Sequence, residues 1–145
     1  FVDRFPRRGL SVDYKKMEER AQVYIDLFRL DISPRTRVES LPMGVRQIVE
    51  ISKALEKDAK IIIFDEPTIG LHPLDVRTLL EVFRHLLSAG ATLVVIEHDL
   101  DMIRNADYIV DLGPGGGADG GRIVATGTPE AVAANKESIT GQYLY

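Results

Sequence analysis

The most constraining feature of this sequence is an uninterrupted apolar run that ends in two carboxylates. Residues 61–64 read Ile-Ile-Ile-Phe, and Asp65, Glu66 and Pro67 come directly after them. A short apolar run of this kind indicates a strand that is buried on both faces, as in a parallel sheet. Open α/β sheets bind ligands at the carboxyl ends of their strands, so the two acids stand at a candidate ligand site. The alternative is a buried strand followed by an acidic turn.

Helical and extended patterns alternate around this strand, which predicts an α/β domain with a mostly parallel sheet flanked by helices. The predicted helices run from residue 13 to before Pro34, over 45–56, 74–88 and 99–104, and from Pro129 onward; the other predicted strands cover 92–96, 108–112 and 122–127. We expect residues 1–12 to form an irregular lead-in. Residues 135–145 read as a polar tail without assigned structure.

Composition narrows the class of protein. The chain has 145 residues, of which 45% are hydrophobic and 28% charged, as expected for one globular domain. It has no cysteine, which excludes zinc ribbons and thiolate chemistry. The net charge of −4 offers no global basic field for DNA or an anionic membrane. No apolar run approaches the roughly 20 residues that span a bilayer, so we expect a cytoplasmic setting. Because the chain begins at Phe1, we also expect a fragment or a processed chain.

A glycine-rich segment over residues 113–121 invites comparison with a phosphate-binding loop. No Lys-Ser or Lys-Thr comes after its last glycine, and no helix is predicted directly after it. The segment therefore fails the Gly-x4-Gly-Lys-Ser/Thr pattern, and we predict a turn between strands.

Three short motifs occur in the order that is typical of ABC-type ATPases. Residues 41–47 (Leu-Pro-Met-Gly-Val-Arg-Gln) resemble the signature loop. Residues 65–68 (Asp-Glu-Pro-Thr) resemble the Walker B motif that leads into the D-loop, and residues 97–99 (Glu-His-Asp) resemble the segment of the switch histidine. This resemblance implies a partial P-loop NTPase core. It also implies that residues 1–56 include part of the ABC helical subdomain and that residues 57–145 belong to the ATPase core.

The same resemblance implies roles for individual residues. Asp65 would bind Mg²⁺ through water and Glu66 would be the general base. His98 would contact the γ-phosphate of ATP, while Gly44 and Arg46 would contact a nucleotide held by a partner. ATP and Mg²⁺ are therefore the implied cofactors.

The resemblance differs between the two halves of the chain. Residues 1–67 resemble the ATPase of a sugar-importing ABC transporter, and residues 68–145 resemble the carboxyl end of the UvrA family of excision-repair ATPases. The first likeness is carried by residues 12–17 and 49–55, and the second by residues 70–72, 95–100, 111–114 and 125–130. We interpret the chain as an engineered or recombined mosaic. A single natural ABC protein with mixed features is the alternative.

Departures from the family pattern limit the function. No Gly-x4-Gly-Lys-Ser/Thr sequence occurs, and the glutamine loop is also absent. In the signature loop, Pro42 and Met43 replace the usual Ser and Gly, and proline removes a backbone N–H. The cysteines of the UvrA zinc modules are missing, so DNA binding is not carried over.

These observations favour the carboxyl-terminal half of an ABC-type nucleotide-binding domain that does not hydrolyse ATP alone. The main alternative is a non-catalytic folding or self-association module with vestigial ATPase residues. A DNA-repair-related DNA-binding module is a weaker alternative. The family's phosphate-loop strand is absent, so we expect one of two outcomes. Strand 107–111 pairs directly with strand 92–96, or both strands keep exposed edges that promote self-association. We favour self-association. A complementary phosphate-loop fragment is the other expected partner; transporter and DNA partners are not expected to bind strongly.

Overall fold

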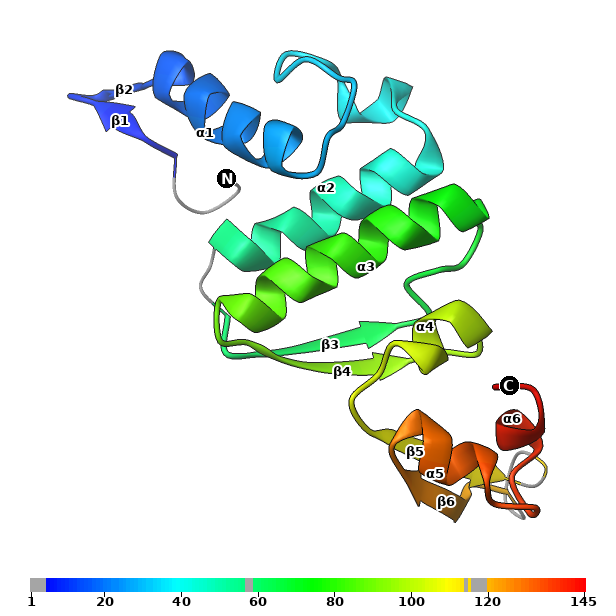
Figure 1. The fold of residues 1–145 in the computed structure, drawn as a ribbon. Helices are drawn as coiled ribbons and strands as arrows, with labels where there is room; N and C mark the ends of the chain where they lie inside the picture. Colours follow the sequence, from blue (N-terminus) through cyan, green and yellow to red (C-terminus); the bar gives the residue numbers. More distant parts are fainter. Residues whose placement is uncertain (1–4, 57–58, 114, 116–119) are drawn as a thin grey trace. The chain divides into compact units, whose positions relative to one another are not determined.

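The computed structural model of this chain describes residues 5–56, 59–113, 115 and 120–145 (Figure 1). It forms two compact units, Phe1–Val95 and Ile96–Tyr145. Of the predicted glycine-rich turn, residues 114 and 116–119 lie outside the described part.

The first unit contains most of the helical structure. Its elements are β1 (Arg7–Arg8), β2 (Ser11–Val12), α1 (Tyr14–Leu27), the 3-10 helix η1 (Val38–Ser40), α2 (Met43–Glu56), β3 (Ile61–Asp65), α3 (Pro73–Ser88) and β4 (Thr92–Ile96). Helices α2 and α3 lie side by side, and strands β3 and β4 run along α3 (Figure 1). The predicted irregular lead-in is partly wrong, because β1 and β2 pair as a short antiparallel hairpin.

Helix α1 begins and ends at local signals. The Asp13 side chain accepts a hydrogen bond from the Lys16 N–H (3.0 Å), which caps the start of the helix. The helix ends before Pro34, as predicted, because Arg29 adopts a left-handed backbone with φ of 52°. The Leu30 N–H then returns to the Ile25 carbonyl (2.9 Å), which closes the last turn well before Pro34.

Helix α3 carries the core of the first unit. It packs against α2, its His85 ring meets Phe28 at the end of α1 with centroids 5.9 Å apart, and the Phe64 ring of β3 stacks on Phe83 with centroids 4.7 Å apart. The buried apolar residues of this unit are Ile25, Phe28, Leu41, Ile48, Ile51, Val76, Leu79, Val82, Phe83 and Leu86. Leu87 of the same helix is 42% exposed.

The prediction that β3 is buried on both faces is wrong for this structure. Along β3 half-buried and exposed residues alternate, so only the face with Ile62 and Phe64 is covered. Ile61 and Ile63 on the other face are 69% and 68% exposed, and Val94 of β4 is 47% exposed. Alternating side chains point to opposite faces of a strand, and in this unit a helix covers one of them.

The strands pair within each of the two units. β3 pairs with β4, with both arrows pointing the same way in Figure 1, and the Thr92 N–H donates to the Lys60 carbonyl (2.8 Å). β5 (Ile109–Gly113) pairs instead with β6 (Arg122–Gly127) in an antiparallel hairpin. Each of these pairings lies within one unit, so the expected pairing of 107–111 with 92–96, which would join the two units, stays a prediction.

The second unit is built on the β5–β6 hairpin. It also contains α4 (Leu100–Arg104), α5 (Pro129–Ala133) and α6 (Ile139–Gln142). Its small core is formed by Ala125, Val132 and Leu144, with partly buried neighbours from α4, α5 and β5.

The carboxyl-terminal segment, to which the sequence pattern assigned no structure, is anchored in this unit. Leu144 is 1% exposed, and Arg104 donates from Nε to the Leu144 carbonyl (2.6 Å) and from Nη2 to the Tyr143 carbonyl (2.8 Å). The Asp111 carboxylate accepts from Ser138 Oγ (2.5 Å) and Thr140 Oγ1 (2.9 Å). These partners lie 27 to 40 residues away in the sequence, so the local polarity of the segment did not reveal them.

Candidate functional site

The carboxyl end of β3 presents Asp65 and Glu66 to solvent. Asp65 is the last residue of the strand and lies on the same uncovered face as Ile61 and Ile63. Glu66 is also exposed, and its backbone is left-handed, with φ of 46°. The adjoining Pro67 is buried, and the Ile69 N–H donates to the Glu66 carbonyl (3.1 Å). The chain therefore turns sharply at Glu66, directly after the strand.

The left-handed backbone at Glu66 is unusual for a residue with a side chain. Its β-carbon crowds the next carbonyl oxygen, which costs about 1–2 kcal/mol. Such strain is found preferentially at functional sites, where the surrounding structure holds it in place. Together with the adjacent carboxylates, it marks this turn as the strongest candidate site in the first unit.

The residues at this turn fit a magnesium ion bound indirectly. In the described part of the chain, no three His, Asp or Glu side chains are grouped closely enough to bind a metal ion by themselves. Mg²⁺ usually keeps several waters and takes one or two carboxylates together with substrate phosphates. A single exposed carboxylate such as Asp65 matches that mode of binding.

Gly44 lies where α2 comes closest to the start of α3. It is buried, and a β-carbon added to it would lie 2.6 Å from both Cγ and Oδ2 of Asp75. Real β-carbons do not come this close to other atoms, so glycine permits the contact between the two helices. Sequence reasoning assigned Gly44 to a nucleotide and missed Asp75, whose only local signal is its place in the first turn of α3.

Arg46 donates hydrogen bonds to the backbone that precedes α2. Its Nε donates to the Leu41 carbonyl (2.7 Å) and its Nη2 to the Glu39 carbonyl (3.0 Å). These bonds hold the signature-like loop against the first turns of α2.

His98 lies in the second unit, between β4 and α4. The side chain is exposed, and its backbone N–H donates to Oε2 of Glu97 (2.9 Å). The same oxygen accepts the Asp99 N–H (3.1 Å), while Asp99 caps α4 by accepting from Met102 N–H (3.0 Å). The structure thus brings Asp65 and Glu66 together in one unit, whereas His98 belongs to the other.

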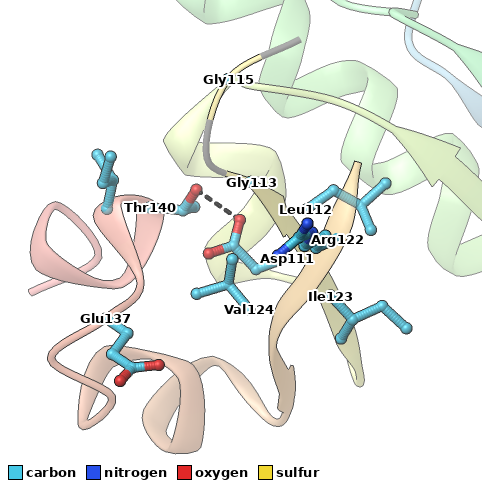
Figure 2. Close-up of a pocket in the computed structure, with 10 residues that line it drawn as sticks. Asp111, Leu112, Gly113, Gly115, Arg122, Ile123, Val124, Glu137 and Thr140 are labelled. Atoms are coloured by element: carbon cyan, nitrogen blue, oxygen red, sulfur yellow. Dashed lines mark hydrogen bonds between the residues drawn. The ribbon is translucent and has the colours of Figure 1, made fainter. Parts of the chain in front are cut away.

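A cavity of 480 Å³ lies in the second unit (Figure 2), and its described lining residues include none of Asp65, Glu66, Gly44, Arg46 and His98. Among the described residues, its charged lining consists of Asp111, Arg122 and Glu137, and the close-up shows the Asp111 carboxylate accepting a hydrogen bond from the Thr140 hydroxyl. Because this carboxylate already anchors the carboxyl-terminal segment, the cavity is a weaker candidate site than the turn after β3.

Comparison with known proteins agrees with the motifs. The family model described as "ABC transporter" matches residues 2–69. UvrABC system protein A of Staphylococcus epidermidis is 45% identical over 132 residues, which is 89% of this chain and 14% of that protein. The same protein of Mycoplasmopsis pulmonis is 49% identical over 108 residues, 72% of this chain and 11% of the relative.

Solved structures give the same result. The crystal structure of UvrA2 from Deinococcus radiodurans matches with a TM-score of 0.71 and 37% identity, over 88% of this chain and 15% of that one. An ATP binding subunit of an ABC transporter matches with a TM-score of 0.62 and 28% identity, over 94% of this chain and 55% of that one.

The fold and these matches place the chain among the ABC-type ATPases, with an α/β core of the P-loop NTPase kind. Within that class it resembles UvrA, although it spans only 14% of the length of the first curated relatives. An alignment of 132 residues cannot fit within residues 68–145, so the likeness to UvrA extends well into the first half. Among the described residues, no helix is both long and apolar enough to cross a membrane.

Proposed function

We propose that this chain supplies the Walker B part of an ATP site. Asp65 binds Mg²⁺ through water, Glu66 polarises the attacking water, and His98 contacts the γ-phosphate. When bound, Mg²⁺ neutralises charge on the phosphates. The main observation that supports this proposal is the pair of exposed carboxylates at the end of β3, with Glu66 in a left-handed backbone conformation.

The signature-like loop faces a nucleotide held by a partner in this proposal. Gly44 keeps α2 close to α3, and Arg46 fixes the loop through two backbone carbonyls. The division into a helical part, 1–56, and a core part, 57–145, belongs to the same proposal.

The chain does not hydrolyse ATP by itself in this proposal. Phosphoryl transfer depends on positioning and on charge stabilisation, and the sequence has no Gly-x4-Gly-Lys-Ser/Thr loop to supply either. The Walker B part becomes functional when a complementary phosphate-loop chain completes the site. Alone, it acts as a non-catalytic module.

ATP turnover and binding test this proposal. We expect turnover at background for the chain alone and ATP affinity that is at best roughly millimolar, about −4 kcal/mol. Turnover that disappears in Glu66→Gln, or micromolar ATP binding by calorimetry, would contradict the inactive state. Turnover that appears on mixing with a phosphate-loop chain, but not in the Glu66→Gln variant, would support the assignment of Glu66.

Self-association is the second part of the proposal. The uncovered face of β3 and β4 exposes Ile61, Ile63 and Val94, and free strand edges favour pairing with another copy. Sedimentation at micromolar concentration tests it, with Ile63→Lys expected to shift the chain toward monomer. Leu10→Lys, at a residue exposed outside the sheet, is the matched control. A monomer in all three chains would refute self-association.

We also propose, for the first half only, an origin in a sugar-transporter ATPase. The match of the ABC transporter model to residues 2–69 is compatible with this origin, whereas the 132-residue alignment with UvrA reaches into the same half and counts against it. DNA binding is not part of the proposed function, since the net charge is −4 and no basic stripe is visible in the sequence. A salt-sensitive shift of duplex DNA at low protein concentration would contradict that exclusion.

A further inference from the structure

Two residues with side chains have a left-handed backbone in the described part of the chain, and they differ in the residue that comes next. Arg29 has φ of 52° and ends α1, whereas Glu66 has φ of 46° and lies directly after β3. In both, the β-carbon crowds the next carbonyl oxygen. The residue after Arg29 is Leu30, but the residue after Glu66 is Pro67.

Proline adds a second penalty at Glu66. The ring of a proline clashes with the backbone N–H and the β-carbon of the residue before it, which favours an extended backbone there. Glu66 thus adopts a backbone that its own side chain and Pro67 both disfavour. Arg29 carries only the first of these penalties and is the natural reference within the same chain.

The flanking turn holds Glu66 in this conformation. Pro67 is buried, the Ile69 N–H donates to the Glu66 carbonyl (3.1 Å), and the Leu71 N–H donates to the Thr68 carbonyl (2.9 Å). Glu66 itself is exposed, so rotation of its backbone moves its carboxylate through solvent rather than through the core. In an extended backbone, Glu66 would continue the alternation of β3 and point away from the face that carries Asp65.

We propose that Glu66 exchanges between this left-handed backbone and an extended one, so that the turn after β3 is a two-position conformational switch for its carboxylate. The two backbones hold the carboxylate in two different positions at the end of β3, and the extended one points it away from the face that carries Asp65. The role of that carboxylate rests on the proposed function. The backbone exchange itself results from the strain and requires no nucleotide.

NMR relaxation dispersion on the nucleotide-free chain tests the switch, because exchange with a minor state on the microsecond-to-millisecond scale broadens the affected amides. We expect dispersion at Asp65, Glu66 and Thr68 and flat profiles around Arg29. Glu66→Gln keeps the same backbone penalties and should keep the dispersion within about twofold. Glu66→Gly accepts the left-handed backbone freely and should lower the minor population by about tenfold or more, which abolishes the dispersion.

The outcomes separate strain from other causes. Flat profiles at residues 65–68 in the unmodified chain overturn the inference and require no variant to fold. Dispersion that survives in Glu66→Gly, or that is lost in Glu66→Gln, also overturns it, because backbone strain would then not be the cause. Dispersion of equal size around Arg29 would overturn the part assigned to Pro67. Failure of ATP binding or turnover would refute the proposed function without changing any of these results.

Discussion

Replacing Gly44 by alanine tests the contact between α2 and α3 most directly. The added β-carbon would lie 2.6 Å from Cγ and Oδ2 of Asp75 and 3.0 Å from its Cβ. Overpacking of this kind typically costs about 1–3 kcal/mol, and alanine recovers up to about 1 kcal/mol of helix propensity. We therefore expect Gly44→Ala to lower the free energy of unfolding by about 1–2 kcal/mol.

A second substitution decides whether Asp75 is the cause. In an Asp75→Ala background the two contacts at 2.6 Å are removed and only the β-carbon at 3.0 Å remains. Gly44→Ala should then cost less than about 0.5 kcal/mol, so the double-mutant cycle should give a coupling of about 1 kcal/mol or more. Urea unfolding followed by far-ultraviolet circular dichroism measures all four chains.

A control glycine makes the result specific. Among the described residues, a β-carbon added at Gly113 would meet only Val124 Cγ2 at 3.5 Å, an ordinary contact, so Gly113→Ala should be nearly neutral. An equal cost of Gly44→Ala with and without the Asp75 side chain would refute the reasoning. It would show that α2 and α3 do not approach each other as described.

Three further predictions concern the second unit. Arg104→Ala removes charged hydrogen bonds to the Leu144 and Tyr143 carbonyls and should lower the free energy of unfolding by about 1–2 kcal/mol. Amide exchange should become faster in the last residues. Lys136→Ala, at an exposed position, is the control. Ser138→Ala removes both a helix cap and a partner of Asp111 and should cost about 1–3 kcal/mol in thermal unfolding. Desolvation and the Glu130 carboxylate raise the pKa of Tyr145 above its ordinary value, so ultraviolet titration should show a late tyrosine that Glu130→Gln moves toward the ordinary range. Unchanged amide exchange in Arg104→Ala would contradict the Arg104 contacts, and unchanged thermal unfolding in Ser138→Ala would contradict those of Ser138. A tyrosine titration that Glu130→Gln does not shift would contradict the contact between Tyr145 and Glu130.

The local pattern was sufficient to predict where the two acids lie, at the end of β3. An apolar run that ends in Asp65 and Glu66 contains both the strand and the acids in consecutive residues, and the structure places both acids there, exposed. Helix starts were predictable for the same reason, because Asp13, Asp99 and Thr128 cap helices through backbone groups three residues away. The assigned chemistry of these acids remains a prediction.

Contacts between distant segments were not predictable from these patterns. An apolar run looks the same whether one or both faces are covered, so the exposed face of β3 could not be foreseen. The contact of Gly44 with Asp75 and the bond of Arg104 to the Leu144 carbonyl join separate elements. The left-handed backbone at Glu66 also has no local signal, because the adjoining Pro67 favours the opposite conformation.

The uncovered face of β3 and β4 has a consequence for temperature. Near room temperature, covering apolar surface is driven by entropy and has a negative heat-capacity change, so it strengthens on warming. Any process that covers Ile61, Ile63 and Val94, which are 69%, 68% and 47% exposed, should show that dependence. A stock of the chain should therefore stay clear in the cold and become turbid when brought to culture temperature, and cooling should reverse the early stages.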